Sequence, residues 1–433
     1  MIVAPPPPAA AQPATHANEV AYVIRRGDTA DQLSRKFLVD GRDWRAFLKL
    51  VRVHDPRRLP AGRQVHIPRS WLRYRIEPAR LASYRGKVAI TANGREVSAT
   101  TGASIGEGMF IATAANSFAT LILADQSRIV LPSQSRVRVR ELRRILLTNA
   151  IDYRLEITGG RLETRVQPLE SPSGRYRIET PVSMTAVRGT EFRVSFAAGT
   201  AITEVLSGHV LFTDADGNTR ALALDPGVGA ARDPAGEVRT EPLLPAPTLE
   251  DPGAVKLDDI VEFRAAPAAG AARYRLVIAG DAGFIDNIVE QVSEDGHFSF
   301  ADIPNGNQFA RISAIAPSGV EGFAQSYGFK RRLASLHGAV DAADDGYRFR
   351  WWGSGSGARR YRFQLMGEAE GAPPIVDRVG LEQESLTLHR LAPGVYRWRV
   401  GLLQIDADDT VETWTSPEKL TIAAPSHTRK ASR

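Results

Sequence analysis

The stretch that decides the fold of the central region is TPVSMTAVRGTEF, residues 180–192. We expect Gly189 to supply a bulge or tight turn at a position where a side chain would clash. The segment is therefore predicted to be a structural motif, made of Val187, Arg188, Gly189, Thr190, Glu191 and Phe192. For Arg188, an internal ion pair with a carboxylate is favoured over a ligand-facing role, because deeply held arginines are usually paired.

The sequence on both sides continues in short segments with a period of two. Phe118–Leu123 has the length of a buried strand, and Arg136–Arg140 alternates arginine with valine. A solvated strand face explains Arg136, Arg138 and Arg140 better than a surface for anionic lipid or wall phosphate. Gly159-Gly160 indicates a turn, and residues 214–218 indicate a hairpin rather than a calcium loop. These signals predict an all-β sandwich or a stacked-strand solenoid.

The central stretch resembles the FecR-type domain, whose hallmark is the Val-Arg-Gly-Thr-Glu-Phe core at 187–192. Gly160-Arg161-Leu162 and the segment 205–210 extend the resemblance, which covers about 84–242. In signalling members of that family, the domain lies in the periplasm, senses an outer-membrane transporter and regulates an anti-sigma system through a membrane anchor. This sequence shows no stretch of anchor length, so the resemblance is to an envelope-scaffold variant.

The N-terminal segment has the order β-α-α-β within about fifty residues. A strand at Ala21–Arg25 precedes Thr29 and Gln32, which have the spacing of a capping box. Leu33 and Phe37 give the first helix a buried stripe, and a second helix is indicated by Trp44, Phe47 and Leu48. Val65 and Ile67 lie on one face of a closing strand that ends at Pro68.

With its Gly27-Asp28-Thr29 loop and its Gly62-x-x-Val65-x-Ile67-Pro68 end, this segment resembles the LysM module. That resemblance implies binding of peptidoglycan or another N-acetylglucosamine-containing glycan in a groove between two loops. Ala30 and Val51 depart from the family pattern, and a degenerate module kept as a packing unit is the alternative. The implied glycan-binding residues are Gly27, Asp28, Thr29, Ala30, Val53, His54, Asp55 and Pro56.

The C-terminal region repeats with a period near ninety residues, the size of an immunoglobulin-like sandwich. Arg273–Leu276 corresponds to Arg360–Phe363, and Val320–Phe323 corresponds to Val411–Trp414. The second copy resembles a fibronectin type III-like domain. Its aromatic residues are interpreted as core anchors rather than sugar-stacking platforms; they are Tyr396, Trp398 and Trp414.

Composition narrows the possible functions. The chain has 433 residues and a net charge of +6. It contains no cysteine, and this absence excludes disulfides, thiol catalysis and cysteine-ligated metals. Histidines have no metal-ligand spacing, and no nucleophile elbow or phosphate loop is present. Paired-carboxylate catalysis needs no local motif, so the sequence does not test it. We expect a non-catalytic protein with no cofactor, no metal, no nucleic-acid partner and no membrane span.

The expected fold class is mostly β and multidomain. The expected divisions are a disordered leader or signal remnant at 1–20, the LysM-like module at 21–69, a linker at 70–83, the FecR-like domain at 84–242, two β-sandwich repeats at 247–331 and 332–424, and a tail at 425–433.

The sequence is compatible with two functions. The favoured one is an exported envelope or periplasmic protein that binds peptidoglycan and acts as a scaffold, with an envelope protein as a further partner of the β domains. The gene would then begin upstream of Met1, and the mature chain near Ala14–Val20. The alternative is an extracytoplasmic regulator that relays a signal through the FecR-like domain to a separate membrane partner.

Overall fold

The computed structural model describes residues 18–423 except 56, 216–220, 356, 370, 372, 407 and 408. Most of the leader, Pro56, the tip of the 214–218 hairpin and the tail therefore lie outside the described residues. The chain divides into two compact units. Unit 1 is Met1–Leu249, Ala265–His297 and Phe309–Ser326, and unit 2 is Glu250–Arg264, Phe298–Gln308 and Tyr327–Arg433. The boundary between the units falls inside the expected first sandwich repeat.

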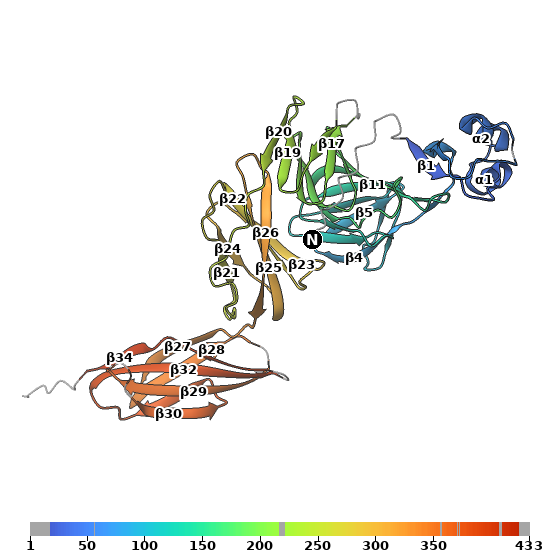
Figure 1. Ribbon diagram of the computed structural model, residues 1–433. Helices are drawn as coiled ribbons and strands as arrows, with labels where there is room; N and C mark the ends of the chain where they lie inside the picture. Colours follow the sequence, from blue (N-terminus) through green and yellow to red (C-terminus); the bar gives the residue numbers. More distant parts are fainter. Residues whose placement is uncertain are drawn as a thin grey trace, which may run out of the picture. The chain divides into compact units, whose positions relative to one another are not determined.

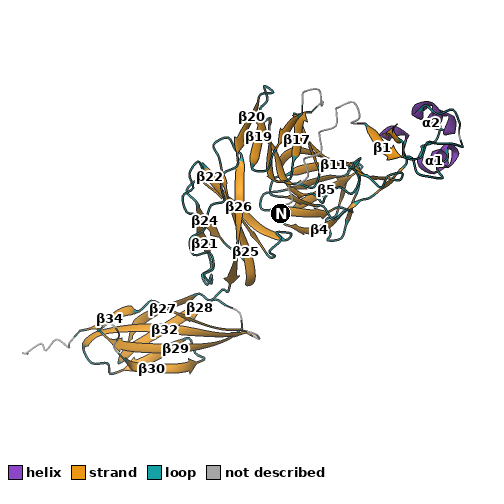
Figure 2. Cartoon of the chain, in the orientation of Figure 1, coloured by secondary structure: helices purple, strands orange, loops and turns teal. Residues whose placement is uncertain are grey.

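Strands dominate the chain outside two short helices (Figure 2), which confirms the expected mostly β, multidomain class. No helix in the described part of the chain is long and apolar enough to cross a membrane.

The N-terminal module has the expected βααβ order (Figure 1). Its two strands pair antiparallel, with Tyr22 opposite Val65. The Thr29 hydroxyl accepts a hydrogen bond from the Gln32 amide at 3.3 Å and so caps the first helix. The elements are β1 (Glu19–Val23), α1 (Ala30–Phe37), α2 (Trp44–Val51) and β2 (Gln64–Pro68).

The core of this module continues into the central domain. Phe47 and Leu72 are buried in the same apolar cluster as Ile145, Leu147 and Ala150, which belong to the end of β11 (Arg136–Ile145) and the turn after it. A module of about fifty residues buries little apolar surface alone, so this shared cluster stabilises both parts.

Residues 70–83, expected to be a linker, belong largely to the sheet of the central domain. The short helix η2 (Arg69–Trp71) is followed by β3 (Tyr74–Ile76), which pairs with β11, and by β4 (Ala79–Arg85), which pairs with β9. These strands are too short to show a clear alternation of apolar and polar residues, so the sequence did not predict them.

The central domain is a strand-rich body in which β3 to β20 form a closed hydrogen-bonded circuit. In β11 the expected alternation is present: Val137 and Val139 are fully buried, while Arg136 and Arg138 are exposed. The remaining strands are β5 (Val88–Ala92), β6 (Arg95–Val97), β7 (Ser104–Ile105), β8 (Phe110–Thr113), β9 (Phe118–Ile122), β10 (Arg128–Leu131), β11 (Arg136–Ile145), β12 (Ile151–Arg165), β13 (Arg175–Glu179), β14 (Ser183–Val187), β15 (Glu191–Ala197), β16 (Thr200–Ser207), β17 (Val210–Asp214), β18 (Leu222–Leu224), β19 (Val228–Arg232) and β20 (Val238–Pro242).

Gly159-Gly160 is not a turn between strands, as the sequence suggested, but a bend inside β12. Before the bend β12 pairs with β11 and β13, and after it β12 pairs with β10 and β15. Gly160 has φ +79°, and a Cβ there would meet the Gln134 carbonyl and lie 2.5 Å from Ser135 Cα. Glycine therefore lets one strand pass from one set of neighbours to another.

The two C-terminal repeats have equivalent sheet orders, β23-β22-β25-β26 and β30-β29-β32-β33. In the second repeat, a separate sheet β27-β28-β31 supplies Phe349 and Trp351 to a core shared with Phe363 and Trp398. Trp398 is thus a core anchor, as expected. The strands are β21 (Val261–Arg264), β22 (Arg273–Ala279), β23 (Asn287–Ser293), β24 (His297–Phe300), β25 (Gly306–Ile315), β26 (Glu321–Arg331), β27 (Leu336–Ala343), β28 (Gly346–Gly353), β29 (Ala358–Gly367), β30 (Pro374–Leu381), β31 (Ser385–His389), β32 (Gly394–Asp406), β33 (Asp409–Trp414) and β34 (Glu418–Ile422).

Candidate functional site

The turn between β14 and β15 brings the 187–192 motif against a distant loop. Gly189 has φ +64°, and a Cβ there would lie 3.0 Å from Pro168 Cα. Both the backbone conformation and the close approach require glycine. The Val166 amide donates to the Thr190 carbonyl at 2.9 Å, so the two segments are also hydrogen-bonded.

Arg188 does not form the internal ion pair expected of it. Its side chain is exposed, and its guanidinium donates to the main-chain carbonyls of Pro172 at 2.6 Å and Ser171 at 3.4 Å. Because Arg188 lies at the surface, water solvates its charge and two carbonyl oxygens accept from its guanidinium, so it needs no buried carboxylate partner. Arg188 thus fixes the main chain of a loop, which we call the 167–174 loop.

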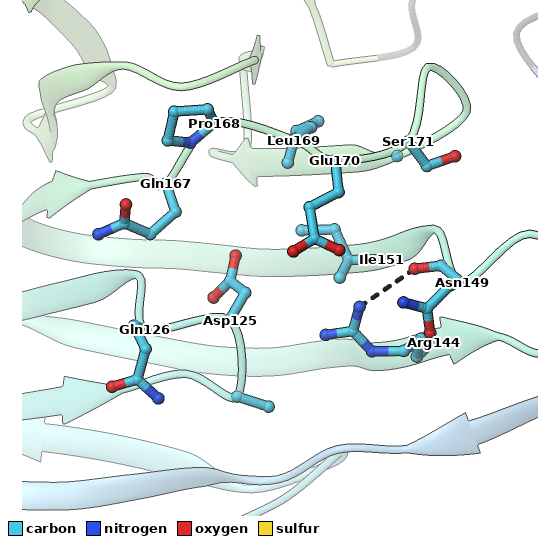
Figure 3. Close-up of a pocket in the computed structure, with 12 residues that line it drawn as sticks. Asp125, Gln126, Arg144, Asn149, Ile151, Gln167, Pro168, Leu169, Glu170 and Ser171 are labelled. Carbon is cyan, nitrogen blue, oxygen red and sulfur yellow. Dashed lines mark hydrogen bonds between the residues drawn. The ribbon is translucent and has the colours of Figure 1, made fainter.

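The 167–174 loop forms one wall of a pocket of about 520 Å³ (Figure 3). The opposite sides come from the turn between β9 and β10 and from the connection between β11 and β12. None of these three segments is adjacent in sequence to another. The lining residues are Ala124, Asp125, Gln126, Arg144, Asn149, Ile151, Gln167, Pro168, Leu169, Glu170, Ser171 and Gly174.

The carboxylates of Asp125 and Glu170 extend toward the same space (Figure 3). Asp125 accepts hydrogen bonds from the Ser127 amide at 3.0 Å and from the Ser127 hydroxyl at 2.8 Å, both within its own turn. Glu170 is exposed, and within the described part of the chain no side chain pairs with it. Both carboxylates are therefore open to a ligand on the pocket side.

Arg144 is the one cationic residue of the lining, and its charge is already matched. Its Nε lies 2.8 Å from both carboxylate oxygens of Glu77, and its Nη1 donates to the Asn149 carbonyl at 3.1 Å. The hydrogen bond with Glu77 raises the pKa of Arg144. The pocket therefore carries an excess of negative charge.

The N-terminal module holds the 167–174 loop from outside the pocket. The Ala21 amide donates to the Ser173 hydroxyl at 3.1 Å, and the Arg69 guanidinium donates to the Ser173 carbonyl. Arg69 also forms a salt bridge with Asp152 at 3.1 Å, at the start of β12. Movement of the module would therefore reach two walls of the pocket.

The first of the two expected glycan-binding loops is held by its own side chains. The Asp28 carboxylate accepts from the Tyr22 hydroxyl at 2.6 Å and from the Arg25 amide at 2.7 Å. Burial, and then the hydrogen bond with Asp28, raise the pKa of Tyr22 to about 12. Ala30 is fully buried in the apolar core of the module, so it offers no surface to a glycan. Gly27 has φ +96° with open space where a Cβ would lie.

The second expected loop is more exposed. His54 and Asp55 are exposed, and the Asp55 carboxylate accepts from the Arg57 amide at 2.9 Å. Val53 packs against the same core that buries Ala30 and Val51. Pro56 lies outside the described residues.

The described residues show no group of three or more histidine, aspartate or glutamate side chains that could hold a metal ion. The pocket residues were missed in the sequence because they come from three turns, none of which carries a recognisable motif. The one available signal was the 187–192 motif, which supports the pocket wall without lining it.

Residues 109–211 match the family model described as FecR protein. This match confirms a FecR domain in the central region, over a shorter stretch than the resemblance suggested. The 187–192 motif and all of the residues that line the pocket fall inside it. No curated protein is significantly similar to the chain in sequence.

Among solved structures, a candidate anti-sigma factor from Parabacteroides distasonis is similar at 15% identity and a TM-score of 0.26. The match covers 31% of this chain and 59% of that protein. A segment of two fibronectin type III domains from chicken tenascin matches at 14% identity and a TM-score of 0.22, over 42% of this chain and 99% of that segment. TM-scores of this size do not establish a shared fold.

Proposed function

We propose that the chain is a non-catalytic extracytoplasmic regulator that relays a signal through its FecR domain to a separate membrane partner. The observation that carries the proposal is the FecR match at 109–211, which contains the motif that builds a pocket wall. A relay needs a module that senses the signal and a surface that the partner recognises. The N-terminal module bonded to the 167–174 loop supplies such a pair.

Export is part of this proposal. The FecR resemblance implies a location outside the cytoplasmic membrane, and the absence of cysteine is compatible with any compartment. Fractionation of cells that express the full genomic locus, followed by sequencing of the N-terminus of the protein, tests it. A product retained in the cytoplasm contradicts the proposed relay.

Photo-crosslinking in living cells tests the partner. A photoreactive benzoylphenylalanine replaces Gln167, which is exposed and lines the pocket. The matched control places it at Glu368, an exposed residue of unit 2. We expect a crosslink to one membrane-embedded protein from position 167 and none from position 368. The same products from both positions, or none from either, would count against the relay.

A second candidate function is glycan binding by the N-terminal module. The observation that favours it is the Gly27 loop, which Asp28 fixes and which has open space above Gly27. A fixed backbone with free space lets a sugar ring approach amide and carbonyl groups. Titration of the full chain with N-acetylglucosamine oligomers tests this function. Asp28→Ala should weaken saturable binding, because it releases the loop, and an absence of binding at millimolar oligomer would exclude it.

A further inference from the structure

The pocket beside the 167–174 loop has a net negative lining. Asp125 and Glu170 each contribute one negative charge, and Glu77 already neutralises the guanidinium of Arg144. Burial is the main factor that raises the pKa of the adjacent Tyr153 phenol, and the negative charge of Asp125 raises it further. Within the lining, an anionic ligand would meet two carboxylates and no cation other than the paired Arg144, while the nearby Arg188 guanidinium is bonded to the carbonyls of Ser171 and Pro172. The lining therefore disfavours anions.

The neutral part of the lining suits a particular shape of cation. The side-chain oxygens of Gln126, Asn149 and Gln167 are hydrogen-bond acceptors around the two carboxylates. Ile151 and Leu169 add apolar surface on which an aliphatic stem can pack. A guanidinium has five N–H donors in a planar fork, so it can use several of these acceptors at once.

We propose that this pocket binds an arginine side chain presented by a protein partner. Charge complementarity and the ring of acceptors support the arginine, and the two walls tied to the N-terminal module connect its binding with that module. The assignment of the arginine to a protein partner rests on the proposed relay function. The preference of the pocket for a guanidinium rests only on the residues that line it.

The test is titration of the full chain with the peptide acetyl-Gly-Gly-Arg-Gly-Gly-amide. The matched control is the same peptide with citrulline, which keeps the length and most of the hydrogen-bonding groups but has no charge. We expect saturable binding of the arginine peptide with a dissociation constant of about 1 mM or tighter. The citrulline peptide should bind at least about tenfold more weakly, since charge-assisted hydrogen bonds are about twice as strong as neutral ones.

Two variants locate the binding. Glu170→Gln removes a charge from an exposed residue with no partner in the described chain, so folding should be unaffected and affinity should fall by about tenfold. Glu368→Gln makes the same change at an exposed residue of unit 2 and should leave affinity unchanged. Raising the salt concentration should weaken binding to the parent more than to Glu170→Gln.

Equal affinities for the arginine and citrulline peptides, or no saturable binding of either, would overturn the inference. Competition by N-acetylglucosamine oligomers at the same site would assign the pocket to a neutral glycan instead, which also overturns it. Neither result affects the proposed relay, which the change in transcripts on deletion of the whole gene tests independently of the pocket. Conversely, peptide binding with unchanged transcripts would leave the site in place and remove the relay.

Discussion

Arg193 of β15 and Glu321 of β26, 128 positions apart in the sequence, form an ion pair in which Nη1 and Oε1 lie 2.5 Å apart. Both side chains are almost fully buried. The Arg193 guanidinium also donates to the Glu321 and Gly322 carbonyls, so it binds both the side chain and the main chain of β26. Within unit 1, the FecR domain and the sheet of the first repeat therefore meet through buried charge.

This ion pair belongs to a network of alternating charges. Glu163 accepts from Arg275 at 2.9 Å and from Arg311 at 2.7 Å, and Arg161 lies 2.7 Å from Glu321. The layer contains four arginines and four glutamates. Its members are Arg161, Arg193, Arg275, Arg311, Glu163, Glu204, Glu290 and Glu321.

Glu321→Ala should strongly destabilise unit 1. The change removes the carboxylate nearest to both Arg193 and Arg161, and their remaining carboxylate partners lie 3.7 Å away. Breaking a buried pair by removing one member costs about 3–5 kcal/mol. Urea unfolding of the full chain measures the loss. Glu237→Ala, which breaks an exposed pair with Arg239, is the matched control and should change the free energy of unfolding by about 0.5 kcal/mol or less. Equal effects would mean that the network adds no stability.

Acid should destabilise this layer over a defined pH range. Burial alone would raise the pKa of Glu321, but the guanidiniums of Arg161, Arg193 and Arg275 outweigh burial and lower the pKa to about 2. A lowered pKa means stability that is present above the unfolded value near 4.5 and is lost as the pH falls toward 2. For Glu204 burial dominates and raises the pKa, which opposes part of this loss.

The free energy of unfolding of the parent should therefore fall by a few kcal/mol between about pH 5 and pH 2. Glu321→Gln should show a flatter dependence, because glutamine does not titrate. Parallel pH curves for the parent and this variant would contradict the assignment of the loss to Glu321.

Gly189→Val should destabilise the FecR domain by about 2–5 kcal/mol. A side chain at positive φ costs about 1–2 kcal/mol, and overpacking against Pro168 adds about 1–3 kcal/mol. Gly102→Val is the control, since Gly102 also has positive φ, at +90°, but open space where a Cβ would lie. Thermal unfolding of the two variants separates the clash from the backbone strain, and equal melting temperatures would show that Pro168 gives way.

Arg69→Ala should loosen the pocket walls. The change removes the donor to the Ser173 carbonyl and the salt bridge to Asp152. The side chains of Arg69 and Asp152 are each about one tenth exposed or less. Hydrogen–deuterium exchange should become faster in residues 144–151 and in the 167–174 loop. Arg73→Ala breaks a pair with Asp40, which is fully exposed, and should leave both segments unchanged. Unchanged exchange in Arg69→Ala would mean that the module and the pocket are independent.

The sequence predicted the parts of the fold that depend on local patterns. The Thr29–Gln32 spacing located the start of α1, because a capping box is a contact between neighbours. The alternation at Arg136–Arg140 located β11, since buried and exposed faces alternate along a strand. The correspondence of Arg273–Leu276 with Arg360–Phe363 located β22 and β29, which hold the same place in their sheets.

The remaining features depend on residues far apart in the chain. The bend at Gly160 exists because β12 exchanges partners, and nothing in a Gly-Gly pair distinguishes a bend from a turn. Likewise Arg188 binds carbonyls of a loop sixteen residues away. The pocket was not predictable, because Asp125 and Glu170 meet only when three separate turns come together.

The most direct test of the relay is the transcript profile of the native host after deletion of the gene and complementation. We predict that deletion changes a defined group of transcripts that one alternative sigma factor controls. The parent gene and Glu368→Gln should restore the profile, while Glu170→Gln should not, because it weakens the pocket and leaves the fold intact. A deletion strain whose transcripts match those of the parent strain under envelope stress would contradict the account.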